Sequence, residues 1–155
     1  MVTKEELEQF DMVEKETINV SKRVTAVELS MFEDNNYELG DMLSERKKQY
    51  EKEKGVSATQ AYFDIEDMCQ ISKSQFTKVI CGSRKATRTF LYKFVVGFKM
   101  TEEEANKYFD LCGGPLTRKN KEDYICLNAL RDKDSIEQLV SDFEKHLELK
   151  IGFEP

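Results

Sequence analysis

The segment ISKSQFTKVICGSRKATRTF, residues 71–90, contains five basic residues and no acidic residue, in a chain whose formal net charge is −6. The stretch without carboxylates is longer still, because no Asp or Glu occurs between Asp67 and Glu102. Its basic residues are Lys73, Lys78, Arg84, Lys85, Arg88, Lys93 and Lys99. Ammonium and guanidinium groups bind phosphate, and nearby carboxylates oppose that binding. Taken alone, such a charge run is more typical of an ordinary solvated helix face. A polyanion-binding surface is the alternative, and it gains support only from further sequence features such as helix-start motifs and residue spacing.

The sequence contains no recognisable catalytic or zinc-binding motif. The chain has one histidine, His146, and four dispersed cysteines with no Cys-x-x-Cys pair: Cys69, Cys81, Cys112 and Cys126. A structural zinc site needs clustered thiolates or imidazoles, and no nucleophile–histidine–carboxylate set or glycine-rich phosphate loop is present. We therefore expect no enzymatic activity, no metal and no cofactor, with the cysteines as buried, reduced thiols.

Helix-start motifs recur along the chain. In a capping box, Ser or Thr is followed three residues later by Glu or Gln, and the two satisfy each other's backbone donors. Such pairs occur at Thr3/Glu6, Ser57/Gln60, Ser72/Gln75 and Thr101/Glu104, with Asp134/Glu137 as an analogous pair. Apolar residues at helical spacing follow them, and glycines at Gly55, Gly82 and Gly113 are typical of helix ends. These patterns predict an all-α protein.

The predicted organisation has three parts. Residues 1–36 form an acidic N-terminal extension, residues 37–113 contain five closely spaced short helices, and residues 114–155 contain two more helices. No segment approaches the roughly 18 uninterrupted apolar residues of a membrane span. The N-terminus MVTKEELEQF is charged where a signal peptide is apolar. We expect a soluble, cytoplasmic protein without membrane contact.

Ser72 is expected to open a helix with a polar outer face. Its inward side carries Phe76, Val79 and Ile80. The outward side chains are Lys73, Ser74, Gln75, Thr77 and Lys78. These hydroxyl, amide and ammonium groups can form hydrogen bonds with base edges and do not repel phosphate.

The turn after this helix adds further donors. Ser83, Arg84 and Lys85 are placed where a phosphate backbone could run, and Arg88 lies on the first turn of the following helix. Lys93 and Lys99 lie beyond this zone and are expected to be solvated. Upstream, residues 57–68 predict another short helix. Two short helices separated by a tight turn, the second polar and basic outside, are typical of a helix-turn-helix.

A family resemblance supports this interpretation. The string I-S-x-S-x-x-x-K-x-x-x-G-x-R-x-x-T resembles lambda-repressor-like domains of the Xre family; it is formed by Ile71, Ser72, Ser74, Lys78, Gly82, Arg84 and Thr87. The chain is also similar to a bacterial group of Xre-like regulators through Met100, Glu103, Glu104, Ala105, Phe109, Gly113 and Leu116, followed by a polar stretch around Asp123. The resemblance covers about residues 39–130.

This resemblance implies a five-helix domain whose third helix enters the major groove of DNA. Carried over by position, the residues facing bases or nearby phosphates are Lys73, Ser74, Gln75, Thr77 and Lys78. The residues holding the DNA backbone are Ser83, Arg84 and Lys85. The chain departs from the family pattern at Glu66, Gln70 and Ala86, where a small residue, glycine and proline are common.

The combined expectation is a non-catalytic, sequence-specific transcriptional regulator, bacterial or phage, that binds double-stranded DNA as a homodimer. In this interpretation Arg84, Lys85 and Arg88 neutralise phosphates. Residues 135–150 are expected to form an amphipathic helix, with an apolar face of Ile136, Leu139, Val140, Phe143 and Leu147. That face is the candidate dimer surface, and packing against its own domain is an equally favoured alternative.

A second function class fits the same residues. The protein would be a protein-interaction module, such as an antitoxin, an anti-repressor or a phage adaptor, that keeps the helix-turn-helix fold without binding DNA. Asp64, Glu66 and Asp67 favour it, because they place negative charge beside the proposed binding surface. Residues 1–36 would then be an arm that binds a partner protein.

Overall fold

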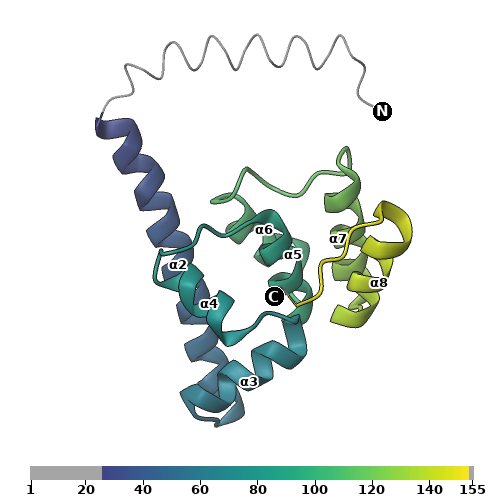
Figure 1. Cartoon of the computed structure of the whole chain (residues 1–155), viewed down its shortest axis with the longest axis horizontal. Coiled ribbons are helices and arrows are strands. Elements are labelled where there is room, and N and C mark those ends of the chain that lie inside the picture. The colour runs from purple at the N-terminus through teal and green to yellow at the C-terminus, as the bar shows by residue number, and fades with distance from the viewer. Residues whose placement is uncertain (1–25, 154–155) are drawn as a thin grey trace. The chain divides into compact units, whose positions relative to one another are not determined.

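The computed structural model describes the backbone of residues 26–153 and the side chains of residues 37–153. In this range the regular structure is entirely helical (Figure 1). The helices are α2 (Ala26–Lys54), α3 (Ala58–Cys69), α4 (Lys73–Ile80), α5 (Arg88–Gly97), α6 (Glu102–Phe109), α7 (Lys121–Asp132) and α8 (Ile136–Leu147). The all-α prediction is thus confirmed for the described part, where no helix combines the length and apolarity of a membrane span. The Thr3/Glu6 pair and residues 1–25 of the predicted extension lie outside it.

Most helix starts follow from local side-chain chemistry. The N-cap side chain accepts a hydrogen bond from the amide three residues on at Ser57, Ser72, Thr87, Thr101, Asn120 and Ser135. The capping predictions at Ser57, Ser72 and Thr101 are therefore confirmed. Helix α8 starts one residue later than predicted from Asp134, because Ser135 with Gln138 forms the same motif.

Helix ends follow two rules. Gly55, Gly82 and Gly113 take the positive φ angles that the sequence predicted for them. Helices α3, α7 and α8 instead end at residues with side chains, namely Gln70 (φ 53°), Lys133 (φ 53°) and Glu148 (φ 55°). Such left-handed positions cost an L-residue about 1–2 kcal/mol each, so surrounding contacts must hold them.

Helix α5 lies at the centre of the compact unit that begins at Asn35. It contacts α3, α6, α7 and α8, and every residue from Phe90 to Val96 is buried. The Phe94 ring stacks on those of Phe76 and Phe90, with centroids 6.1 and 6.4 Å apart. Burying such a side chain contributes about 1.5–3 kcal/mol. A helix buried on all sides fixes the positions of its neighbours.

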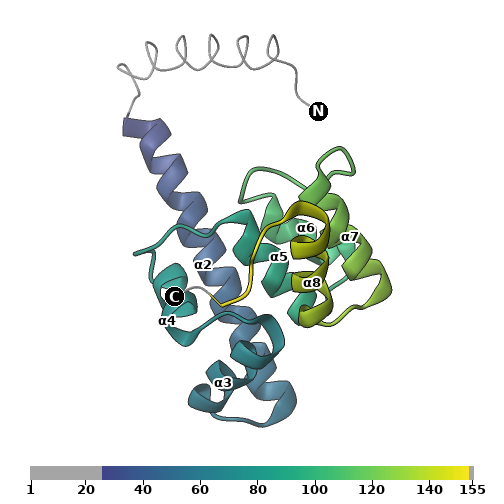
Figure 2. The same ribbon diagram turned by 45° about the vertical axis from the view of Figure 1, so that its right-hand side comes forward.

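Lys93 lies inside this core, so its predicted solvation is wrong. Its residue is only 1% exposed, because α5 is covered on every side. The ammonium donates to the carbonyl oxygens of Gln70, at 2.9 Å, and Gly152, at 3.0 Å. One buried cation thus joins the α3–α4 turn to the segment after α8, which runs back towards α3 and α4 (Figure 2). Lys99 is exposed, as predicted.

The C-terminal helices belong to the same core. Ile136, Leu139 and Phe143 of α8 are buried in their own domain, where α8 contacts α5 and α7. Of the two alternatives for this helix, packing within the domain therefore applies, and its apolar face is not available as the predicted dimer surface. Residues of the expected segments 37–113 and 114–155 pack into one hydrophobic core around α5. The boundary expected after residue 36 lies within α2.

Tyr50 joins α2 to α3 and gives the fold a pH dependence. Its hydroxyl donates to Asp64 Oδ2 at 2.8 Å. Burial, and then this hydrogen bond, raises the pKa of Tyr50 from 10.0 to about 12. The folded protein holds this proton more tightly than the unfolded chain does. The stabilisation is therefore complete below pH 10 and is lost as the pH rises through 12.

We expect the free energy of unfolding in urea to fall between pH 10 and 12, and to fall less steeply in Tyr50→Phe. Burial also raises the pKa of Tyr92, Cys69 and Cys126. Only the difference between parent and variant therefore reports on Tyr50. Equal slopes in the two proteins would show that Tyr50 makes no such contribution.

Candidate nucleic-acid interface

The apolar side of helix α4 packs against the core and against α3. Phe76 and Val79 are buried, and the Phe76 ring meets Tyr62 of α3 edge-on with centroids 6.1 Å apart. Ile71, in the turn between α3 and α4, is also fully buried. These anchors fix which side of α4 faces outward.

The outward side is polar and basic. Lys73, Ser74 and Lys78 are exposed and Thr77 is half-buried. At 3.6 residues per turn these four positions fall within one half of the helix circumference. Ser83, Arg84 and Lys85 are exposed in the following turn. The Arg84 amide donates a hydrogen bond to the Lys78 carbonyl oxygen at 3.1 Å, which holds this turn against the end of α4. We call this set the α4 face: Lys73, Ser74, Thr77, Lys78, Ser83, Arg84 and Lys85.

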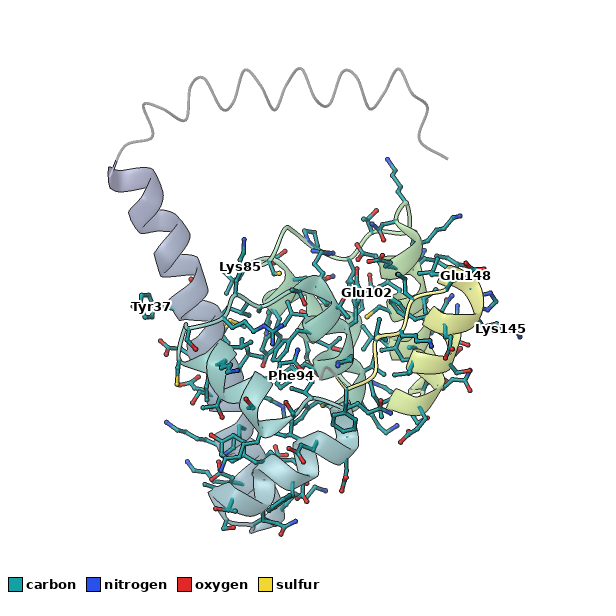
Figure 3. All side chains as sticks on the ribbon, viewed as in Figure 1. Tyr37, Lys85, Phe94, Glu102, Lys145 and Glu148 are labelled. Carbon is teal, nitrogen blue, oxygen red and sulfur yellow. The ribbon has the colours of Figure 1, made fainter. Side chains whose placement is uncertain are left out.

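The α4 face contains four cations and no carboxylate. Lys85 projects from the turn before α5, away from the helical body in which Phe94 lies (Figure 3). The Thr77 hydroxyl donates to the Lys73 carbonyl at 2.7 Å, and the Ser83 hydroxyl donates to the Lys78 carbonyl at 3.2 Å. Both oxygens keep lone pairs that can accept hydrogen bonds. The face therefore offers cationic donors beside hydroxyl acceptors.

Gln75 does not share the α4 face. It is 6% exposed, and its Oε1 is buried without a hydrogen-bond donor among the described residues. The residue lies four positions before Val79 and so belongs to the inner stripe of the helix. Its placement does not favour the base contact that the sequence predicted.

Arg88 is also directed inward. Its guanidinium donates to Asp123 Oδ2 at 2.8 Å, and to the carbonyl oxygens of Cys112 and Gly114 at 2.7 and 2.8 Å. It also lies 4.9 Å from the centroid of the Phe109 ring. These partners lie 21 or more residues after Arg88 in the sequence, so no local sequence pattern predicts them. Arg88 stabilises the fold from this position and is not presented for the predicted phosphate contact.

The three carboxylates of α3 have different surroundings. Glu66 Oε1 accepts from the Lys73 amide at 2.8 Å and so caps the N-terminus of α4. Asp64 accepts from Gln60 at 2.9 Å and from Tyr50, and these hydrogen bonds lower the pKa of its carboxyl group. Asp67 is exposed. The sequence indicated that these residues add negative charge near α4, but not that Glu66 serves as a cap.

The cysteines correct one prediction. Cys69 and Cys126 are buried and Cys112 is half-buried, but Cys81 is exposed as the C-cap of α4. Cys81 lies four residues after Thr77 and therefore continues the outer side of the helix. It places an exposed thiol beside the α4 face. His146 is exposed in the last turn of α8.

Among residues 37–153, no three His, Cys, Asp or Glu side chains gather as metal ligands. Comparison of the chain with protein-family models, with curated proteins and with solved structures finds no match. Function is therefore inferred from the α4 face itself.

Proposed function

We propose that the protein is a non-catalytic, sequence-specific DNA-binding transcriptional regulator of the lambda-repressor-like Xre kind. The observation that carries this proposal is the α4 face, whose seven residues comprise four cations and three hydroxyl groups on one exposed side, with no carboxylate among those seven. Helix α4 lies in the major groove, and Lys73, Ser74, Thr77 and Lys78 contact base edges or nearby phosphates. The turn contacts the phosphate backbone through Ser83, Arg84 and Lys85.

The proposed active form is a cytoplasmic homodimer. Two such helices spaced about 34 Å apart match successive major grooves on one side of DNA, and their symmetry requires a palindromic operator. Because the apolar face of α8 is buried in its own domain, the dimer uses another surface. A two-fold symmetric motif among bound duplexes would support the dimer.

Arg84→Gln is expected to weaken binding about three- to tenfold on every duplex, because it removes a phosphate contact and no base contact. The slope of log affinity against log salt concentration should fall by about 0.9. The measurement is fluorescence anisotropy at about 50 and 200 mM salt, with duplexes selected from a random library. Lys107→Gln is the matched control, since Lys107 is exposed on α6 outside the α4 face.

A second readout locates the interface. Bound duplex should slow the alkylation of the exposed Cys81 by iodoacetamide, whereas the half-buried Cys112 should change little. Two results would refute the proposal: no duplex retained even at low salt, or Arg84→Gln behaving like Lys107→Gln.

A protein-interaction module is the second candidate, and Glu66 favours it. A helix N-terminus is a ready site for phosphate, but the Glu66 carboxylate already occupies that of α4. Glu66→Gln separates the two functions. In a DNA-binding protein the neutral variant binds duplex at least as tightly as the parent, since a repulsive charge is removed. In an interaction module neither protein binds duplex, and residues 1–36 become the bait for partner capture.

A further inference from the structure

A groove of about 620 Å³ runs between α7 and α8, within the range of about 300–1,000 Å³ typical of small-molecule sites. One stripe of α7 lines it through Lys121, Ile125 and Asn128, which are four and then three residues apart. The remaining lining residues are Arg118 and Lys119 from the preceding loop, Tyr124 from α7, and Asp142, His146 and Leu147 from α8.

The charge of this groove is opposite to that of the chain. Arg118, Lys119 and Lys121 bring three cations to the end where α7 begins, whereas the whole chain has a net charge of −6. The one carboxylate of the lining, Asp142, comes from α8, and its Oδ1 already accepts from Gln138 Nε2 at 2.9 Å. An anionic group is therefore favoured at the loop end.

The groove also offers apolar surface. Ile125 and Leu147 are partly buried and pack against the core. Tyr124 is 49% exposed, so its ring is accessible to a ligand in the groove. Tyr124, Arg118 and Asn128 also line an adjoining hollow of about 330 Å³. A flat ligand lying against Tyr124 would thus reach cations and an amide at its edges.

We infer that the α7–α8 groove is a binding site for a small anionic ligand with a flat apolar body, such as an aromatic phosphate or carboxylate. The cations bind its charged group, and Tyr124, Ile125 and Leu147 pack against its ring. The site is separate from the α4 face: in Figure 3, Lys85 beside α4 and Lys145 on α8 lie at opposite sides of the helical body. The inference therefore stands whether or not the protein binds DNA.

The test uses 1-naphthyl phosphate as the probe, titrated into the full-length ¹⁵N-labelled protein and followed by amide chemical shifts. We expect saturable 1:1 binding, with shifts concentrated in residues 117–128 and 142–147. Arg118→Gln and Lys121→Gln should each weaken binding about two- to fivefold, as expected for the loss of an exposed ion pair. Tyr124→Ala should weaken it about two- to tenfold through lost ring contacts.

Two controls keep the inference falsifiable. Lys107→Gln makes the same charge change on α6 and should bind like the parent, while neutral 1-naphthol should bind more weakly than the phosphate. All four substituted side chains are exposed, and an unchanged amide spectrum before titration shows that each variant is folded. The inference is overturned by shifts that do not saturate, by Arg118→Gln matching Lys107→Gln, or by inorganic phosphate binding as tightly as the aromatic ester.

Discussion

Asp123→Ala is expected to lower the free energy of unfolding by about 3 kcal/mol, since removal of one partner leaves a poorly solvated charge behind. Asp123 Oδ2 accepts from Arg88 at 2.8 Å and from the Thr117 amide at 3.1 Å, and its Oδ1 accepts from the Tyr92 hydroxyl. The Asp123 side chain is 2% exposed and that of Arg88 is 27% exposed. The estimate therefore lies at the lower end of the roughly 3–5 kcal/mol typical of such losses.

Helix α7 contains a matched control for this substitution. Asp132 also pairs with an arginine, Arg131, at 3.0 Å, but their side chains are 51% and 72% exposed. Asp132→Ala should change the free energy of unfolding by no more than about 0.5 kcal/mol, as is typical of surface substitutions. Urea titrations of both variants give the comparison. Equal losses at Asp123 and Asp132 would show that the buried network does not stabilise the fold.

A double substitution tests whether the charge itself is required. Arg88→Met with Asp123→Leu replaces the ion pair by apolar side chains and should be more stable than Asp123→Ala alone, because no buried charge is left unpaired. The Arg88 guanidinium joins α5, the residue 112–114 turn and α7.

Local patterns predicted the parts of the fold that local chemistry determines. The starts of α3, α4 and α6 follow from capping boxes, since donor and acceptor lie three residues apart in the sequence. The left-handed ends at Gln70, Lys133 and Glu148 could not be predicted in this way. At Gln70, for example, the carbonyl is held by Lys93 from the centre of α5. Such positions depend on partners that only the folded chain supplies.

The candidate interface shows the same division. Six of the predicted residues are exposed on or beside α4, because their positions follow from helical spacing and from the turn at Gly82. Helical spacing also places Gln75 with Val79 on the inner side and Cys81 with Thr77 on the outer side, because residues four apart share a face. The burial of Gln75 and the exposure of Cys81 could therefore have been predicted from the sequence. Arg88 is different. Its direction is set by Asp123, 35 residues away, and a charge count cannot distinguish a buried cation from a solvated one.

Gly97→Ala is expected to cost about 3 kcal/mol, at the upper end of the usual range for overpacking. A Cβ atom there would lie 2.3 Å from Cys69 Sγ and 2.6 Å from the Met68 carbonyl oxygen. Alanine favours a helix over glycine by about 1 kcal/mol, but this gain cannot offset a backbone clash. Because Met68 and Cys69 end α3, the last turn of that helix must move away from α5.

Two further variants test this mechanism by urea unfolding. Gly152→Ala should cost no more than about 0.5 kcal/mol, since its Cβ would meet only the movable Gln70 Oε1, at 3.3 Å. Cys69→Ala combined with Gly97→Ala should cost less than the sum of the two single changes, because the sulfur contact is removed while the Met68 carbonyl clash remains. Additive losses would place the cost of Gly97→Ala elsewhere. Since the end of α3 leads directly into the turn before α4, Gly97→Ala should also weaken the proposed DNA binding at temperatures where the variant is folded, although it changes no residue of the α4 face.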